Sequence, residues 1–142
     1  MLKGIPKTLS PELLKILMEM GHGDEIVIAD GNFPAASNAQ RLIRADGLDI
    51  PPILDDILTL LPLDTYVPHQ AALMGVVPGD TVVPTIWDTY KQIIAKHEPQ
   101  ASIETIDRFA FYERAKKAYA VIATSEAALY ANIILCKGVV KS

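Results

Sequence analysis

Apolar residues recur at the spacing of an amphipathic α-helix in several stretches of the chain. The first stretch follows Ser10, whose hydroxyl can accept a hydrogen bond from the free amides of a first helical turn, and it ends before Gly21 and Gly23. Its apolar stripe consists of Leu13, Leu14, Leu17 and Met18. Three further helices are predicted. Residues 35–45 suit a helix that closes near Gly47, and residues 51–61 have Pro52 near the start and Pro62 beyond the end. Residues 85–96 again carry apolar residues at helical spacing.

Short apolar runs separate the predicted helices. Residues 26–29, Ile-Val-Ile-Ala, show no alternation of apolar and polar positions, as expected for a strand that is covered on both faces. Further strands are predicted over residues 71–77, 102–106, 119–123 and 131–136. Because helical and extended segments alternate, we expect an α/β fold in which a layered sheet carries helices on both faces. Without an internal repeat or linker, residues 1–142 are expected to form a single domain.

Composition and charge narrow the possible functions. The net charge is −4 and the longest basic run is Lys116-Lys117, so nucleic-acid binding, which needs concentrated positive charge, is not expected. No stretch approaches the roughly 18 apolar residues of a membrane span. With no signal peptide at the N-terminus, the chain is expected in the cytoplasm. Cys136 is the only cysteine and is expected to be a small buried hydrophobe.

His22 is the first candidate for acid/base chemistry. It lies between two glycines, where the backbone lets a ligand approach closely, and histidine titrates near neutral pH. The alternative is that its imidazole caps the C-terminus of the preceding helix. Asp24 could orient the ring or be a solvated loop acid.

Asp30 and Arg108 are placed where ligands are often bound. Asp30 ends a predicted strand, and ligands of open α/β sheets bind outside the carboxyl ends of strands, although an Asp before Gly31 can also form a turn with its own backbone. Arg108 follows Asp107, which is placed to cap a helix, so its cation lies at the positive end of the helix dipole. It is either held there for a ligand or paired with Asp107 or Glu113.

The segment before the last predicted strand offers a phenol and an amide. Tyr130 and Asn132 are two positions apart, so in an extended segment they point to the same side. The alternative is a strand entry with the tyrosine packed under the sheet. His69, His97 and Arg114 are expected at the surface.

Four motifs together resemble the L-fucose mutarotase / ribose pyranase family. They are the segment from Arg108 to Ala115, the turn from Gly21 to Asp24, the strand end Ala29-Asp30 and the run from Tyr130 to Leu135. The first of them is similar to the fucose branch specifically, whereas the stretch from Asp49 to Gln70 matches weakly.

The resemblance implies a cofactor-independent mutarotase that interconverts anomers of a free monosaccharide, L-fucose first and ribose or galactose as alternatives. It implies His22 as the catalytic residue and no metal. It implies sugar contacts from Asp30, Arg108, Tyr130, Ala131 and Asn132. It further implies a homo-oligomer, commonly a decamer of two stacked pentamers with sites near subunit boundaries, and the 50% apolar content also favours association. A non-catalytic sugar-binding or regulatory protein is the alternative function.

Overall fold

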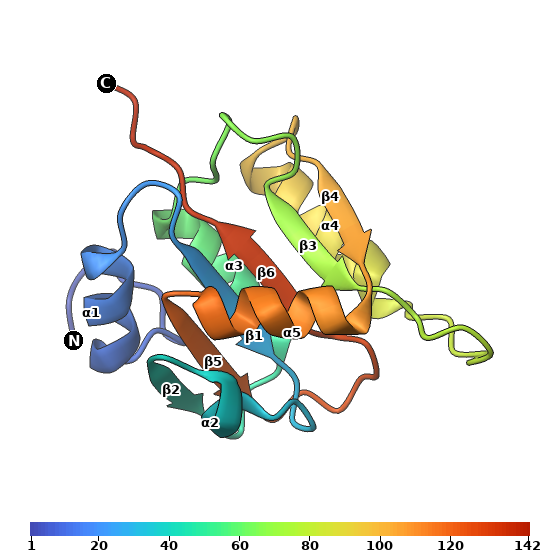
Figure 1. Ribbon diagram of the computed structural model, residues 1–142. Coiled ribbons are helices and arrows are strands. Elements are labelled where there is room, and N and C mark those ends of the chain that lie inside the picture. Colours follow the sequence, from blue (N-terminus) through green and yellow to red (C-terminus); the bar gives the residue numbers. More distant parts are fainter.

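The strands that the sequence predicts join in one mixed sheet in the computed structural model, which describes residues 1–142 (Figure 1). The elements in chain order are α1 (Pro11–Glu19), β1 (Glu25–Ala29), α2 (Ala35–Asn38), β2 (Leu42–Ala45), α3 (Ile50–Leu60), β3 (Ala71–Met74), α4 (Ile86–His97), β4 (Ile103–Ile106), α5 (Arg108–Lys117), β5 (Ala120–Thr124) and β6 (Ile133–Cys136).

The order of strands across the sheet is β2-β5-β1-β6-β3-β4. β6 is antiparallel to both of its neighbours, β1 and β3, whereas the other three pairs are parallel. Ile28 near the end of β1 pairs with Ile133 at the start of β6, and Glu25 pairs with Cys136. The residues before β6 therefore lie beside the loop that follows β1, and the residues after β6 lie beside the turn that precedes β1.

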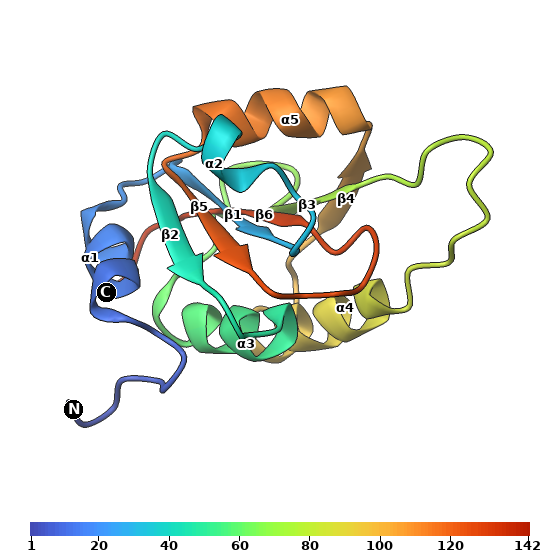
Figure 2. The same cartoon turned by 90° about the horizontal axis from the view of Figure 1, so that it is seen from below.

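Helices cover both faces of the sheet, as expected for the fold. Figure 2 shows α2 and α5 on one face and α3 and α4 on the other. Each face has its own apolar core, because successive strand residues point to opposite sides. Ile26, Ile53 and Ile94 belong to the larger core on the α3 and α4 side, and Val27 and Phe111 to the smaller core under α5.

Most predicted elements are confirmed, including the first helix, in which Ser10 Oγ accepts from the Leu13 amide. The helix predicted over residues 35–45 is wrong. It ends at Asn38, and β2 follows from Leu42 to Ala45. Met18, expected in the apolar stripe of the first helix, is 85% exposed, and Ile16 is buried in that helix instead.

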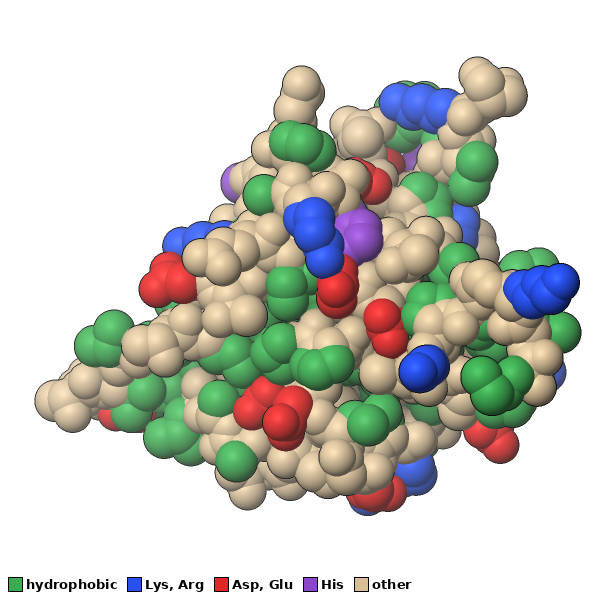
Figure 3. Space-filling model, turned by 180° about the vertical axis from the view of Figure 1, so that it is seen from behind, with side chains coloured by type: hydrophobic (Ala, Val, Ile, Leu, Met, Phe, Trp, Pro, Cys, Tyr) green, Lys and Arg blue, Asp and Glu red, His purple; other side chains and the backbone are tan.

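Helix length and the charges on one face of the molecule bear on two of the function classes considered from composition. None of the helices has the length and apolar character that crossing a bilayer requires. On the face behind the sheet, basic and acidic side chains are interspersed with apolar ones, and the blue side chains form no continuous area (Figure 3). This distribution agrees with the acidic net charge of −4.

Candidate active site

His22 forms a hydrogen-bonded pair with Asp64. Its Nε2 lies 3.0 Å from Asp64 Oδ1, with the imidazole 45% exposed and the carboxylate side chain only 4% exposed. The His22 ring also lies 5.4 Å from the Tyr66 ring, centroid to centroid, at a tilt of 56°. The alternative that His22 caps α1 is wrong, because the helix ends at Glu19 and the imidazole bonds to Asp64 instead.

Asp64 is the site residue that the sequence did not reveal. Its backbone amide donates to the Cys136 carbonyl, and the neighbouring Leu63 forms an antiparallel bridge with Lys137, so the exit of β6 fixes the segment. Asp64 Oδ1 also accepts from the Tyr66 amide at 3.0 Å. That bond, offset in part by desolvation and supported by His22, holds the pKa of Asp64 below its ordinary value. The carboxylate is therefore ionised at neutral pH and accepts a hydrogen bond from His22 Nε2.

Asp24, which was one candidate for orienting the ring, forms no hydrogen bond with the imidazole. Its Oδ2 accepts from the Gly21 amide at 2.8 Å and closes the turn that presents His22. Gly23 adopts a left-handed φ of 87° in this turn, and its amide donates to the Lys137 carbonyl. The two glycines thus form the turn, while Asp64 orients the ring.

Asp30 lies at the other end of β1 and is 7% exposed. Its amide donates to Asn132 Oδ1 at 2.8 Å, and its Oδ1 accepts from the Asn32 amide at 2.9 Å. Burial raises the pKa of Asp30 above its ordinary value, while amides at Asn32 and Phe33 oppose the shift. The carboxyl group thus forms the turn that one alternative predicted, and it also borders a cavity of about 320 Å³.

Tyr130 has an unusual backbone, with a left-handed φ of 56° that is the only such value outside glycine in the chain. The prediction that Tyr130 and Asn132 share one side rested on an extended segment and is wrong at Tyr130. Trp87 Nε1 donates to the Tyr130 carbonyl at 2.8 Å, and the Tyr130 hydroxyl donates to Asp80 Oδ2 at 2.5 Å. Ala131 is fully buried, and its carbonyl accepts from the Tyr90 hydroxyl at 2.6 Å.

Arg108 opens α5 without a carboxylate partner. Asp107 accepts from the Ala110 amide at 3.0 Å, and Glu113 pairs with Lys116, so the alternative of a salt bridge to either acid is wrong. The exposed Arg108 guanidinium lies 5.7 Å from the Phe109 ring and 5.5 Å from the Tyr112 ring. Its donors remain available to a ligand at this edge of the sheet.

The predicted residues therefore form two separate groups at opposite ends of the sheet. One group is the imidazole pair of His22 and Asp64, before β1 and after β6. The other consists of Asp30, Arg108, Tyr130 and Asn132, at the carboxyl ends of β1 and β4 and before β6. Five residues of β1 separate the groups, about 16 Å at ~3.3 Å per residue. Within one chain, a single monosaccharide cannot contact both.

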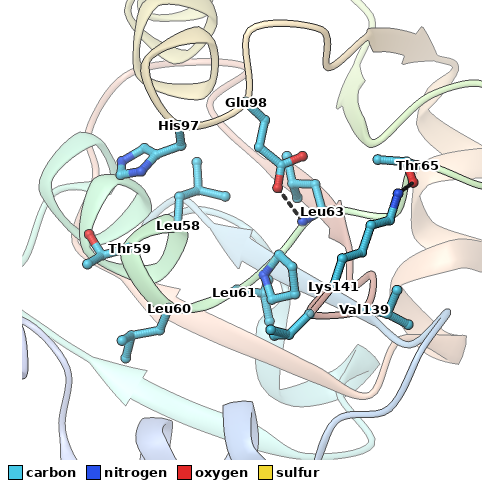
Figure 4. A pocket seen from close by; sticks show the side chains of 12 residues that line it. Leu58, Thr59, Leu60, Leu61, Leu63, Thr65, His97, Glu98, Val139 and Lys141 are labelled. Atoms are coloured by element: carbon cyan, nitrogen blue, oxygen red, sulfur yellow. Dashed lines mark hydrogen bonds between the residues drawn. The ribbon is translucent and has the colours of Figure 1, made fainter.

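A cavity of about 550 Å³ lies between the ends of α3 and α4 and the C-terminal segment, and Leu63 and Thr65, the neighbours of Asp64 in the chain, line it (Figure 4). Half of its 12 lining residues are hydrophobic, among them Leu58 and Leu61. Its polar side chains are already engaged, since Glu98 accepts from the Leu63 amide at 2.8 Å and His97 lies 2.6 Å from Asp55. The cavity therefore offers few polar groups to a sugar.

Two surface predictions are also wrong. Arg114 is 28% exposed and contacts Glu25 at 2.5 Å and Glu104 at 2.8 Å. The thiol of Cys136 joins this cluster at 2.9 Å from Glu25, and burial raises the pKa of Cys136 to about 12. His97 is 20% exposed and paired rather than solvated. His69 is at the surface as expected, with Nδ1 2.9 Å from Ser102 Oγ.

Comparison with known proteins identifies close relatives along the whole chain. Residues 3–140 match the model of the RbsD / FucU transport protein family. A fucose mutarotase from Mus musculus is 56% identical over 96% of this chain and 94% of its own length. The crystal structure of a Streptococcus pneumoniae fucose mutarotase in complex with L-fucose is 59% identical, with a TM-score of 0.95 over 99% of this chain and 100% of that chain. The structure of FucU from Bifidobacterium longum is 57% identical, with a TM-score of 0.95 over 98% and 100%.

Proposed function

This chain belongs to the RbsD / FucU transport protein family, and from that membership we propose that it is a mutarotase that interconverts the anomers of free L-fucose. The observation that carries the proposal is the 59% identity, over nearly the full length of both chains, to a fucose mutarotase whose structure contains L-fucose. The Arg108–Ala115 segment resembles the fucose branch of the family, which favours L-fucose over ribose as the substrate. Galactose is the alternative substrate, and a comparison of exchange rates distinguishes it from L-fucose.

The reaction requires only proton transfers. Opening the ring of a hemiacetal delivers a proton to the ring oxygen while the anomeric hydroxyl loses one, and reclosure on the other face reverses both transfers. Histidine suits this exchange because its side chain can both donate and accept protons near neutral pH. No cofactor takes part in the proposed reaction.

The His22–Asp64 pair supports His22 as the acid/base residue. Because the ionised Asp64 carboxylate accepts from Nε2, neutral His22 carries its proton on Nε2 and presents the lone pair of Nδ1. A negative charge beside Nε2 also stabilises the imidazolium that forms when Nδ1 takes a proton. The imidazole is nearly half exposed, so a sugar can approach the ring.

The second group of residues is suited to hold the sugar. Asp30 offers a carboxylate at the end of β1, and Arg108 offers unpaired guanidinium donors. Asn132 fixes the Asp30 backbone through its Oδ1 and keeps its amide donors. We propose that Asp30, Arg108, Tyr130, Ala131 and Asn132 form the binding half of the site, with Ala131 contributing through its backbone.

Two copies of the chain are needed to unite the halves. Since β1 separates His22 from Asp30, we propose a homo-oligomer in which the His22–Asp64 pair of one copy faces the Asp30 half of another. The family resemblance points to a decamer. Exposed apolar side chains on both halves, Tyr66 at 70% and Phe109 at 74%, support contacts between copies there. We also propose a cytoplasmic location, in keeping with the free Cys136 thiol.

Saturation-transfer NMR on the anomeric protons of L-fucose tests the proposal. Saturating one anomer should reduce the signal of the other only when the protein is present. Parallel samples with galactose, ribose and glucose establish the preference, and L-fucose should exchange fastest. Line broadening without exchange for all four sugars would favour the non-catalytic sugar-binding protein instead.

A further inference from the structure

The segment between β3 and α4 reaches away from the sheet and returns to it (Figure 2). Near its start, Val77 and Asp80 close a turn through a 3.0 Å hydrogen bond between the Asp80 amide and the Val77 carbonyl. Pro78 and Gly79 occupy the two central positions, and the φ of 92° at Gly79 suits a type II turn. The turn directs the Val77 amide and the Asp80 carboxylate toward the same point.

That point is the hydroxyl of Tyr130. The phenol donates to Asp80 Oδ2 at 2.5 Å, while the Val77 amide lies 3.4 Å from the same oxygen. The other carboxylate oxygen, Oδ1, accepts from the Val82 amide at 3.1 Å and so keeps the Asp80 side chain in place. Trp87, at the far end of the segment, donates to the Tyr130 carbonyl. Both ends of the segment therefore bind one residue, whose left-handed backbone is itself unusual in the chain.

These contacts limit what the phenol can offer to a sugar. A tyrosine hydroxyl has one proton and two lone pairs. The proton is engaged by Asp80, and the long contact from Val77 uses one lone pair weakly. The hydrogen bond to Asp80 raises the pKa of Tyr130, against the effect of the Arg108 charge, so the phenol stays neutral near pH 7. What remains is an acceptor whose strength a charged partner increases.

We propose that Asp80 is a positioning residue for the sugar: it accepts the hydrogen bond that the Tyr130 hydroxyl donates, so the neutral phenol can serve a sugar hydroxyl only as a hydrogen-bond acceptor. This inference rests on the proposed function, because it concerns the binding half of that site. Asp80 acts through Tyr130 and does not itself contact the sugar.

A double-mutant cycle on steady-state exchange of L-fucose tests this role. Asp80→Ala and Tyr130→Phe should each raise the KM by about tenfold with kcat within about threefold, because a contact made equally in ground and transition states affects binding. The double variant should be no weaker than Tyr130→Phe alone. Asp80→Asn should recover part of the loss, because its amide oxygen still accepts the phenol proton.

A control variant and a second measurement separate the positioning role of Asp80 from effects of charge and folding. Asp88→Ala removes the same charge from an exposed position in the first turn of α4 and should leave the KM unchanged. The titration of Tyr130, followed by the NMR signal of its Cζ, should move down in Asp80→Ala. This readout requires no activity.

The possible failures are distinguishable. Wild-type protein that does not exchange the L-fucose anomers would overturn the proposed function and the sugar contact with it. Active wild-type protein together with a wild-type KM in Asp80→Ala would overturn the role of Asp80 alone. So would a loss in the double variant equal to the product of the two single losses, or an unchanged Tyr130 titration.

Discussion

The imidazole of His22 owes its orientation to a residue 42 positions away in the chain. Asp24 was the obvious partner by sequence distance, yet it closes the glycine turn instead. Asp64 lies in the stretch from Asp49 to Gln70 that matches the family weakly, and nothing in its local pattern separates it from a loop acid. Only the return of the chain along β6 brings it to His22.

His22→Ala should lower the rate of L-fucose exchange by roughly 10²–10⁴-fold while the protein stays folded, because positioned acid/base catalysis contributes about this much. Asp64→Asn should lower the exchange rate by roughly 10²–10⁴-fold, mainly in kcat, because an amide can donate to Nε2 and stabilise the wrong tautomer of His22. Saturation-transfer NMR and circular dichroism measure both properties. Asp49→Asn, whose side chain caps no helix amide, is the matched control. Full activity in His22→Ala would remove this residue from the mechanism.

Arg108→Lys should weaken L-fucose binding by about tenfold, because lysine keeps the charge but loses the planar set of donors. The free energy of unfolding should stay the same, since Arg108 forms no salt bridge in the fold. Isothermal calorimetry against L-fucose measures the affinity. Lys116→Arg, the reverse exchange on the same helix, serves as control. An unaltered affinity in Arg108→Lys would assign this residue to another role.

Asp30→Asn should abolish L-fucose binding yet raise the melting temperature at pH 7. A carboxyl whose pKa is higher in the folded than in the unfolded protein stabilises the fold at low pH, and this stability is lost as pH rises from about 3.8 through the raised value. At pH 7 the ionised Asp30 therefore lowers the stability of the fold. Asparagine removes this destabilising charge, and its Oδ1 can still accept a hydrogen bond from the Asn32 amide. Melting curves from pH 3 to 8 should converge at the acidic end. A lower melting temperature of the variant at pH 7 would contradict this account of Asp30.

The segment that follows β6 holds the backbone of Asp64 in place beside His22. Gly138 donates to the Pro62 carbonyl at 2.8 Å and lies against the backbone that leads to Asp64. A Cβ on Gly138 would lie 2.7 Å from the Leu63 carbonyl carbon and 2.8 Å from Asp64 Cα, and it would also clash with the Leu63 carbonyl oxygen. Any side chain must push this backbone away.

Gly138→Ala should cost about 1–3 kcal/mol of unfolding free energy, as overpacking against backbone usually does. It should also reduce exchange, because Asp64 moves with the displaced segment. Chemical denaturation and the NMR assay measure the two effects. Gly21→Ala is the control for stability, since its Cβ would meet nothing closer than Asp24 Oδ2 at 3.8 Å. Equal stability of Gly138→Ala and wild type would show that the backbone there can shift without cost.

Long periodic elements were predictable from sequence, and short edge elements were not. α1, α3, α4 and α5 present an apolar face or a capping residue, and the central strands are continuous apolar runs. β2 buries only Ile43 among its four residues, and its pairing with β5 is a tertiary contact that no local pattern announces. The helix predicted there followed propensity, and strand pairing overrode it.

Residue types and strand ends were enough to predict candidate site residues. They did not predict which of these residues lie close together in the fold. Asp30 and Asn132 come together because β6 runs antiparallel to β1, which the sequence does not indicate. The burial of Arg114 depends on Glu25 and Glu104, two acids from different strands. Contacts of this kind arise only from the arrangement of the whole chain.

At the scale of the molecule, the central claim is that two copies contribute to each active site. It explains why residues with sugar-handling chemistry lie at both ends of one sheet. It also separates this protein from a binder that holds sugar with the Asp30 half alone. A symmetric oligomer repeats the same pair of half-sites at every boundary.

Complementation between two inactive variants tests this claim most directly. His22→Ala and Asp30→Asn are produced together with different affinity tags, mixed oligomers are isolated through both tags, and L-fucose exchange is measured by saturation-transfer NMR. Each variant alone should be inactive, whereas mixed oligomers should recover about a quarter of wild-type activity, because random assembly pairs two intact halves at about one boundary in four. Mixed oligomers as inactive as the single variants would contradict a site shared between copies.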